Sequence, residues 1–266
     1  MTQLTEHRKT SRPILGPALA LAALLGSLSF AEDKPSNKLR ADKEALAPLQ
    51  GFVGKWKGAG FLRRGSTKGA WREDSAWAWK FSDGRACLEF SSPGARHLRR
   101  GQLAAAEKSG RYVLNAELPD EGGNARYRGV KNKDGKLVFE ILEAERKNSP
   151  APARISINLL AAGKRLVVLY EGKNARSGRH YRLGEVGYTL SGTSISSGSG
   201  QPECIVTGGR GTIRVEHKGK SYTVCCKGCL EAFREDPEAV LSEWGTRKKE
   251  ALERKKIKEK DQARPQ

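Results

Sequence analysis

Short segments in which apolar and polar side chains alternate fill the sequence from about residue 52 to residue 191. In the clearest of them, Trp77, Trp79 and Phe81 alternate with Ala78 and Lys80. A period of two places the three aromatic side chains on one face of a β-strand and leaves the opposite face to water. Nine further segments of this kind lie at residues 56–62, 86–90, 101–106, 111–117, 125–131, 136–142, 154–160, 166–171 and 181–190.

Turn-forming residues separate these segments. Glycine and aspartate tolerate the positive φ that tight hairpin turns require, and short turns join antiparallel neighbours. About ten strands with no helix between them can bury every strand edge by closing on themselves. We therefore predict a mainly β fold, with an antiparallel up-and-down β-barrel over residues 48–191. The turns include Ser82-Asp83-Gly84, Lys108-Ser109-Gly110, Glu121-Gly122-Gly123, Lys133-Asp134-Gly135 and Ala162-Gly163-Lys164.

The barrel region opens with Gly54-Lys55-Trp56-Lys57-Gly58. This segment resembles the Gly-x-Trp-x-Gly start of lipocalin-like and nitrobindin-like barrels, and the resemblance implies a lipocalin-like barrel whose floor is plugged by Trp56. Barrels of this kind can enclose one apolar small molecule or a haem. A haem would call for a histidine aimed at the lumen, for which His180 is the candidate. The competing interpretation places His180 in an exposed turn.

The N-terminal residues have the layout of a signal peptide. A basic stretch at residues 7–12 precedes an uncharged apolar run at residues 14–30, and Ser29 and Ala31 match a signal-peptidase site. We expect residues 1–31 to be removed and the mature protein to be exported, periplasmic or secreted, with no transmembrane segment. An uncleaved membrane anchor is the alternative. Elsewhere the composition is typical of a mobile lead-in at 32–47 with at most a short helix, a flexible linker at 192–201 and a basic tail at 246–266.

Four of the five cysteines are concentrated near the C-terminal end, at Cys204, Cys225, Cys226 and Cys229. Two thiolates two or three residues apart converge on one ion when the chain turns between them, and Lys227-Gly228 supplies such a turn. Cys204 would bring a third thiolate from a neighbouring hairpin. The apolar spacing after Cys229 predicts a helix, whose N-terminal N–H groups would stabilise a thiolate. A domain of about 45 residues rarely folds without a metal or disulfide.

The cysteines belong to a longer pattern, which resembles that of the YHS and TRASH group of metal-binding domains, themselves similar to treble-clef zinc modules. Ile205 replaces a proline of that pattern, and the Tyr-His-Ser triplet is absent. The resemblance implies a small α+β, treble-clef-like cysteine domain at residues 202–245, with Cys204, Cys225 and Cys229 as metal ligands. The matching residues are Cys204-Ile205-Val206-Thr207-Gly208, Gly219-Lys220-Ser221-Tyr222, Cys225-Cys226-Lys227-Gly228-Cys229, Phe233 and Asp236-Pro237.

The fourth coordination position is open to Cys226, to His217 or to a ligand from outside the protein. Cys226 is otherwise a packed thiol, and His217 is otherwise a solvated side chain on the hairpin rim. Soft thiolates favour zinc or copper(I) over magnesium or calcium, so we expect one zinc or copper ion. Disulfides are the alternative in an oxidising compartment, and a redox pair of Cys226 and Cys229 is a third interpretation. We expect Cys87, in the barrel, to be a buried, inert thiol.

Charge and missing motifs narrow the function. The formal net charge is +19, from 49 Lys and Arg against 30 Asp and Glu, which favours contact with an anionic surface. Nucleic acid is not expected as a partner, because the basic residues are not interleaved with aromatic residues in one stripe. The sequence has no nucleophile elbow, His-Glu-x-x-His motif, P-loop or dinucleotide fingerprint, so we do not expect an enzyme.

Together these features predict an exported protein whose C-terminal cysteine domain coordinates a soft metal ion, zinc or copper, with the barrel as a carrier or interaction domain. The alternative assigns the function to the barrel. The barrel would then hold an apolar small molecule or haem, and the cysteine domain would be a structural zinc staple.

Overall fold

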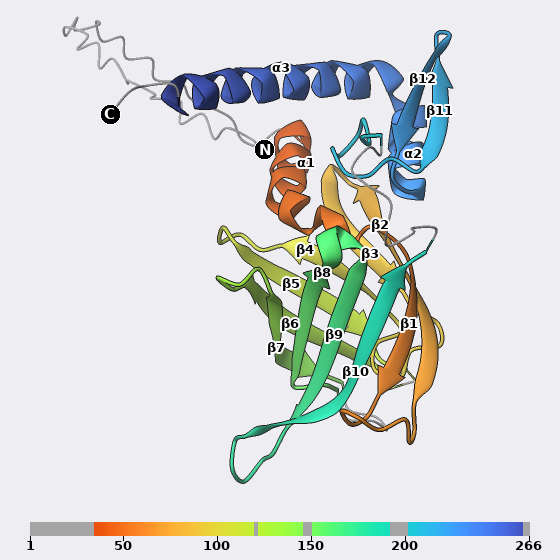
Figure 1. Ribbon diagram of the computed structural model, residues 1–266, viewed down its shortest axis with the longest axis vertical. Coiled ribbons are helices and arrows are strands. Elements are labelled where there is room, and N and C mark those ends of the chain that lie inside the picture. The colour runs from red at the N-terminus through yellow and green to blue at the C-terminus, as the bar shows by residue number, and fades with distance from the viewer. Residues whose placement is uncertain (1–34, 120–121, 146–150, 192–201, 263–266) are drawn as a thin grey trace, which may run out of the picture. The chain divides into compact units, whose positions relative to one another are not determined.

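Ten antiparallel strands form a closed β-barrel in the computed structural model of the protein (Figure 1). The structure describes residues 35–119, 122–145, 151–191 and 202–262. Each strand pairs with the next along the chain, and β1 pairs with β10 to close the barrel, with Trp56 opposite Leu190. The strands are β1 (Gly54–Phe61), β2 (Trp71–Ser82), β3 (Arg85–Ser91), β4 (Arg100–Ala105), β5 (Arg111–Glu117), β6 (Asn124–Lys131), β7 (Leu137–Ala144), β8 (Arg154–Leu160), β9 (Arg165–Lys173) and β10 (His180–Leu190).

The barrel confirms the fold predicted from the alternating segments and their turns. Between β2 and β3, Asp83 and Gly84 have positive φ angles of 51° and 65°. Positive φ at both central residues is typical of a two-residue type I′ hairpin turn, which matches the twist of the flanking strands. The segment predicted at residues 77–81 is the second half of β2, which begins six residues earlier, at Trp71.

Alternate residues of β2 face the barrel interior. Glu73, Ser75, Trp77 and Trp79 are buried, while the residues between them are exposed or half-buried. Trp77 stacks on Phe90 of β3 with a centroid distance of 4.9 Å. The two rings fill the interior between the first strands of the barrel, as the period of two predicts.

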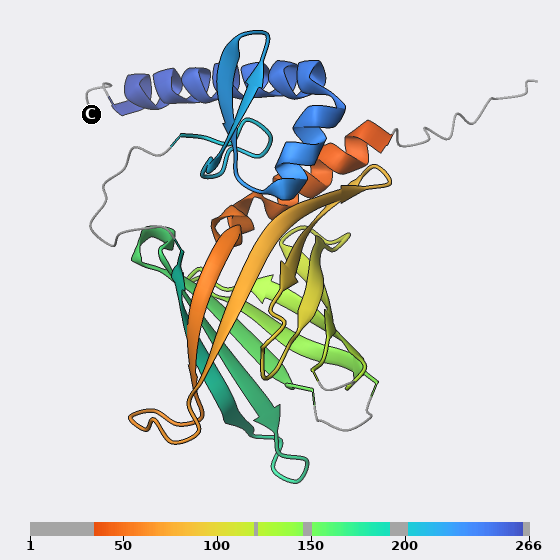
Figure 2. The same ribbon diagram turned by 90° about the vertical axis from the view of Figure 1, so that its right-hand side faces the viewer.

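Two helical segments precede the barrel, α1 (Pro35–Leu46) and the 3-10 helix η1 (Ala47–Phe52). Helix α1 packs against β3 and β4 at one end of the barrel (Figure 2). Buried Asp42 accepts hydrogen bonds from the Nε and Nη2 atoms of Arg85, at 2.7 and 3.1 Å, and from the backbone N–H of Ala86 at 3.0 Å. A twelve-residue helix therefore occupies most of the segment for which we predicted a mobile lead-in with at most a short helix, and Asp42 fixes this helix to β3.

Trp56 lies in the core beside η1. Its side chain is 1% exposed, and its indole N–H donates a hydrogen bond of 2.8 Å to the backbone carbonyl of Phe52. A buried indole N–H needs such a partner. Trp56 thereby joins the first strand of the barrel to the 3-10 helix that leads into it.

The C-terminal region consists of a β-hairpin followed by two helices. The hairpin is formed by β11 (Ile213–His217) and β12 (Lys220–Val224), and the helices are α2 (Lys227–Glu235) and α3 (Pro237–Gln262). A small region of helix and sheet after the barrel is therefore confirmed. Helix α3 runs through the boundary that we predicted between residues 245 and 246, so residues 246–262 of the predicted tail continue the helix.

The described part of the barrel and the C-terminal region share one core. Their buried residues form a single hydrophobic cluster, and the described residues belong to one compact unit. The predicted signal peptide at 1–31 and linker at 192–201 lie outside the described residues.

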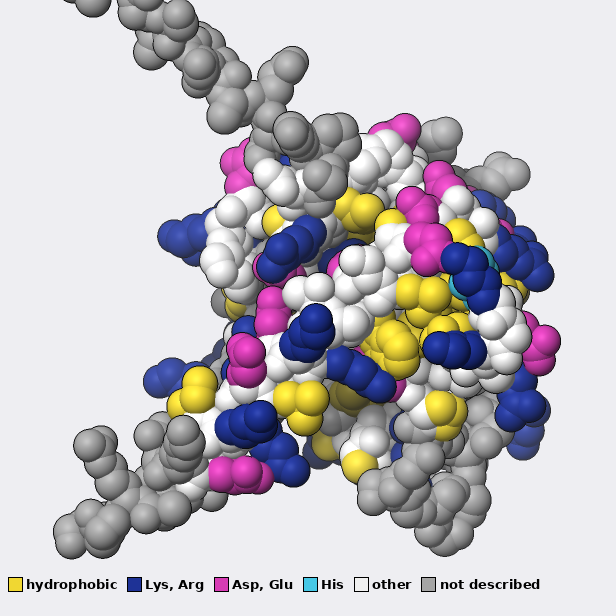
Figure 3. Space-filling model, turned by 90° about the horizontal axis from the view of Figure 1, so that it is seen from above, with side chains coloured by type: hydrophobic (Ala, Val, Ile, Leu, Met, Phe, Trp, Pro, Cys, Tyr) yellow, Lys and Arg dark blue, Asp and Glu magenta, His cyan; other side chains and the backbone are white. Residues whose placement is uncertain are grey.

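The face that carries α3 is of mixed charge. Figure 3 shows Lys and Arg side chains spread over it, with Asp and Glu between them and no single basic stripe.

Leu252 and Ile257, in the last part of α3, are 60% and 59% exposed. Within the described residues, no helix combines the length and apolar character that crossing a membrane requires.

Candidate metal centre

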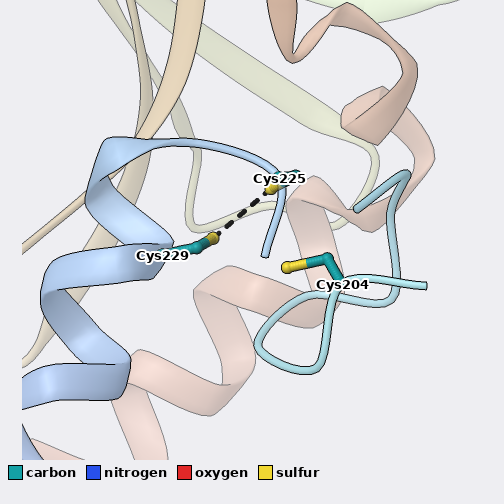
Figure 4. Close-up of side chains that lie close together, drawn as sticks. All are labelled: Cys204, Cys225 and Cys229. Carbon is teal, nitrogen blue, oxygen red and sulfur yellow. Dashed lines mark hydrogen bonds between the residues drawn. The ribbon is translucent and has the colours of Figure 1, made fainter. Parts of the chain in front are cut away.

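Three cysteine thiols converge between the hairpin and α2. The Sγ atoms of Cys204, Cys225 and Cys229 all lie within 4.8 Å of one another, and Figure 4 shows the three side chains pointing toward a common centre. The Sγ atoms of Cys225 and Cys229 are 3.4 Å apart. Cys204 and Cys229 are 0% exposed and Cys225 is 7% exposed, so the sulfurs are shielded from water.

Cys204 is presented by a tight loop. The backbone N–H of Cys204 donates to the carbonyl of Gly209 at 2.6 Å, and the N–H of Gly208 donates back to the carbonyl of Cys204 at 2.8 Å. The N–H of Ile205 donates to the carbonyl of Thr223 at 3.0 Å, which fastens the loop to β12. The hairpin brings the first cysteine to the other two across twenty intervening residues, as the spacing predicts.

The other cysteines lie where β12 ends and α2 begins. Cys225 follows β12 directly, Cys226 is the N-cap of α2, and Cys229 lies in the first turn of that helix. The unpaired N–H groups of a helix N-terminus carry partial positive charge, which stabilises a nearby thiolate. The local sequence thus places two of the ligands at a helix N-terminus.

Gly228 has a different role from the one that we predicted. We expected Lys227-Gly228 to form a turn, but these are the first two residues of α2. A Cβ on residue 228 would lie 1.8 Å from the backbone carbonyl oxygen of Trp79 in β2. Glycine is needed there because the helix start lies directly on a strand of the barrel.

Cys226 lies at the edge of the cluster, beside β2. Its Sγ is 3.8 Å from the Sγ of Cys225, and it accepts a hydrogen bond of 3.4 Å from the backbone N–H of Trp79. It does not belong to the group of three thiols whose sulfurs are all mutually close. The structure therefore places three of the four predicted cysteines together and the fourth next to them.

The thiols share protons through hydrogen bonds. Hydrogen bonds from Cys225 and then Cys229 lower the pKa of Cys204. Donating to Cys204 raises the pKa of both Cys225 and Cys229, since loss of either proton breaks these bonds. The cluster therefore retains some thiol protons in the absence of an ion, and a bound metal would displace them.

His217, the other candidate for a fourth ligand, is paired elsewhere. Its Nε2 atom lies 2.9 Å from the carboxylate of Glu238, and its ring is nearly perpendicular to that of Phe233, at a centroid distance of 6.0 Å. Hydrogen bonds from Lys218 and from His217 lower the pKa of Glu238 to about 2. His217 is not part of the thiol group, so the structure gives it a partner in α3 rather than a place among the ligands.

Cys87 is separate from the cluster. It is half-buried in β3, and burial raises the pKa of its thiol. All five cysteines carry free thiols, with no disulfide among them in the described chain.

A polar group inside the barrel was missed by the sequence analysis. Buried Glu73 accepts a hydrogen bond of 2.6 Å from the indole N–H of Trp71 and another from the hydroxyl of Tyr188. His97 packs against the ring of Tyr170 with a centroid distance of 4.4 Å. The sequence does indicate that Glu73 points inward. It is separated from Trp77 and Trp79 by an even number of positions, so the period of two places all three on the interior face.

A small cavity lies among the described residues of the barrel interior. This cavity of about 20 Å³ lies against Ser75, Ser92, Tyr170 and Tyr188, close to the volume that a single water needs. His180, the candidate haem ligand, is not among the residues that line it, and its Nε2 atom lies 3.8 Å from the half-exposed carboxylate of Glu140.

No protein-family model and no curated protein matches the chain. One similar solved structure is described as the crystal structure of Rv2717c from M. tuberculosis. It is 12% identical, with a TM-score of 0.36, and the match covers 55% of this chain and 97% of that one. A likeness at this level carries no inference about function.

Proposed function

We propose that the protein binds one soft metal ion, zinc or copper(I), through Cys204, Cys225 and Cys229. The observation that carries the proposal is the convergence of three buried thiols from separate chain segments within 4.8 Å. Zinc–sulfur bonds of about 2.3 Å in a tetrahedral site place ligand sulfurs roughly 4 Å apart. The thiols are therefore spaced as ligands of one ion, without a large rearrangement of the chain.

The fourth ligand decides what kind of site this is. If Cys226 turns from the Trp79 N–H toward the ion, the site has four thiolates and is closed, as structural zinc sites are. If Cys226 keeps its hydrogen bond to β2, the fourth position is left for a ligand from outside, which suits capture or delivery of the ion. The proposal includes export of the protein. That part rests on the sequence of residues 1–31 alone.

The test is elemental analysis of the protein purified without chelator and without added thiol reductant. We expect about one equivalent of zinc or copper per chain. Cys229→Ser removes a central ligand and should abolish retention of the ion, whereas Cys87→Ser, the matched control in the barrel, should retain it. Metal-free wild-type protein with few free thiols after denaturation would show that the cysteines form disulfides and would overturn the proposal.

The cavity beside Ser75 and Tyr188 lends no support to the alternative function. A haem or a comparable apolar ligand needs several hundred Å³, as small-molecule sites generally do, and this cavity measures about 20 Å³. An absorption spectrum of the purified protein provides the check, since a Soret band would show a bound haem.

A further inference from the structure

Two of the cysteine sulfurs accept hydrogen bonds from the barrel side of the molecule. The side-chain amide nitrogen of Gln50, in η1, lies 3.8 Å from the Sγ of Cys225. The backbone N–H of Trp79, in β2, lies 3.4 Å from the Sγ of Cys226. Sulfur accepts hydrogen bonds at longer range than oxygen, and an ionised sulfur accepts them more strongly than a thiol.

The orientation of the Gln50 amide is fixed by its other partner. Its Oε1 atom accepts a hydrogen bond of 2.8 Å from the indole N–H of Trp79. An indole N–H can only donate, so the amide oxygen must face Trp79 and the amide nitrogen must face Cys225. Gln50 therefore offers an N–H to the thiol cluster whatever the state of the cysteines.

The loop that carries Cys204 leaves room for this amide. A Cβ on Gly209 would lie 1.9 Å from the Nε2 atom of Gln50 and 2.4 Å from its Cδ atom. The φ angle of Gly209 is not in the left-handed region, so the backbone itself accepts other residues. The absence of a side chain at 209 lets Gln50 reach between the loop and Trp79.

We infer that the barrel side of the molecule completes the metal centre, with Gln50 as a positioning residue. The N–H of Gln50 orients Cys225 and withdraws electron density from its sulfur. The inference rests on the proposed metal binding. Outer-sphere partners of this kind orient the ligands and typically change metal affinity by about 10- to 100-fold when removed. The barrel then acts as part of the binding site, beyond the carrier role that the sequence indicates.

Gln50→Glu tests the inference with little change of shape. The carboxylate still accepts from Trp79 but offers no N–H to Cys225 and adds charge beside it. Cobalt(II) serves as the probe, because its thiolate charge-transfer band reports the electron density on sulfur, and zinc competition gives the affinity. We expect zinc affinity to fall about 10- to 100-fold and the cobalt band to move to lower energy.

Two further variants separate the effect from charge and from misfolding. Gly209→Ala leaves Gln50 intact but displaces its amide, so the same band shift is expected from it. Gln102→Glu on β4 adds the same charge to the barrel and should leave band and affinity unchanged. If Gln50→Glu and Gly209→Ala both bind like the wild type, the inference is wrong while metal binding stands. If the wild type binds none of cobalt, zinc and copper(I), the proposed function and this inference fail together.

Discussion

The backbone of Gly228 lies so close to the carbonyl oxygen of Trp79 that a Cβ on residue 228 would stand 1.8 Å from it. That oxygen belongs to a paired barrel strand, which cannot move aside as a flexible side chain would. Helix α2 would have to leave β2, and Cys229 in its first turn would move with it. The spacing between cysteine cluster and barrel thus depends on the absence of one methyl group.

We expect Gly228→Ala to destabilise the protein by about 1–3 kcal/mol, because it overpacks a backbone contact. The matched control is Gly245→Ala in α3, where an added Cβ meets nothing within 4 Å. Alanine at an open helical position should be neutral or stabilising by about 0.5–1 kcal/mol. Urea unfolding at fixed zinc concentration measures both. Equal stability of the two variants would contradict the tight contact.

His97 should make stability depend on pH. Burial, and then the charge of Arg96, lower the pKa of His97 to about 4, below the value of about 6.5 expected in the unfolded chain. Between these values the unfolded state binds more protons than the folded state, so stability falls as pH falls through this window. The full loss should be about 2 kcal/mol, reduced because the ring is partly exposed.

His97→Phe should remove this part of the pH dependence. Urea midpoints of wild type and variant, measured from pH 7 to pH 4, give the difference directly, and acid release of metal cancels because both proteins keep the cysteines. Parallel curves for the two proteins would mean that His97 is not the responsible group.

Asp42→Asn should loosen α1 from the barrel. The substitution replaces a carboxylate that accepts from Arg85 and from the Ala86 N–H, which leaves donors poorly matched at a buried position. We expect a cost of about 1–3 kcal/mol. Glu44→Gln, on the same helix, breaks only an exposed pair with Arg40 and should change stability by less than about 0.5 kcal/mol. Thermal unfolding compares the two, and a similar small effect from both would rule out the anchoring role.

Chelation should change the reactivity of the cluster thiols but not that of Cys87. A bound ion blocks alkylation of its ligands, whereas Cys87 lies outside the cluster and should be labelled at the same rate in either state. Iodoacetamide labelling followed by peptide mass analysis reports each cysteine separately. The prediction fails if labelling of Cys204, Cys225 and Cys229 is the same before and after the chelator.

The barrel was predictable because its signal is local. Alternation and glycine turns located nearly every strand to within a few residues, yet the first part of β2 was missed. Residues 72–75 are Arg-Glu-Asp-Ser, which lack apolar alternation because the interior face carries Glu73 and Ser75. Buried Glu73 accepts a hydrogen bond from Tyr188, a partner so distant in sequence that spacing does not show it.

The convergence of the cysteines was also predictable, from the spacing that brings a hairpin and a helix N-terminus together. The helical lead-in and the outer contacts of the centre were not. Asp42 and Gln50 acquire their roles only through Arg85, Trp79 and Cys225, which are brought to them by the closed barrel. Tertiary contacts between polar side chains leave no periodic pattern in a sequence.

Closure of the barrel is expected to be a late step in folding, after the local parts of the C-terminal region have formed. The pair of β1 and β10 joins Trp56 to Leu190 across more than half of the chain, and contacts so distant in sequence form slowly. The cysteine hairpin and α2 are local and can form early, but Gln50 and the Trp79 N–H reach them only once the barrel holds η1 and β2 in place. If the centre binds an ion as proposed, an ion captured during folding would meet a weaker centre than an ion that arrives afterwards, and metal retention would measure how far folding has gone.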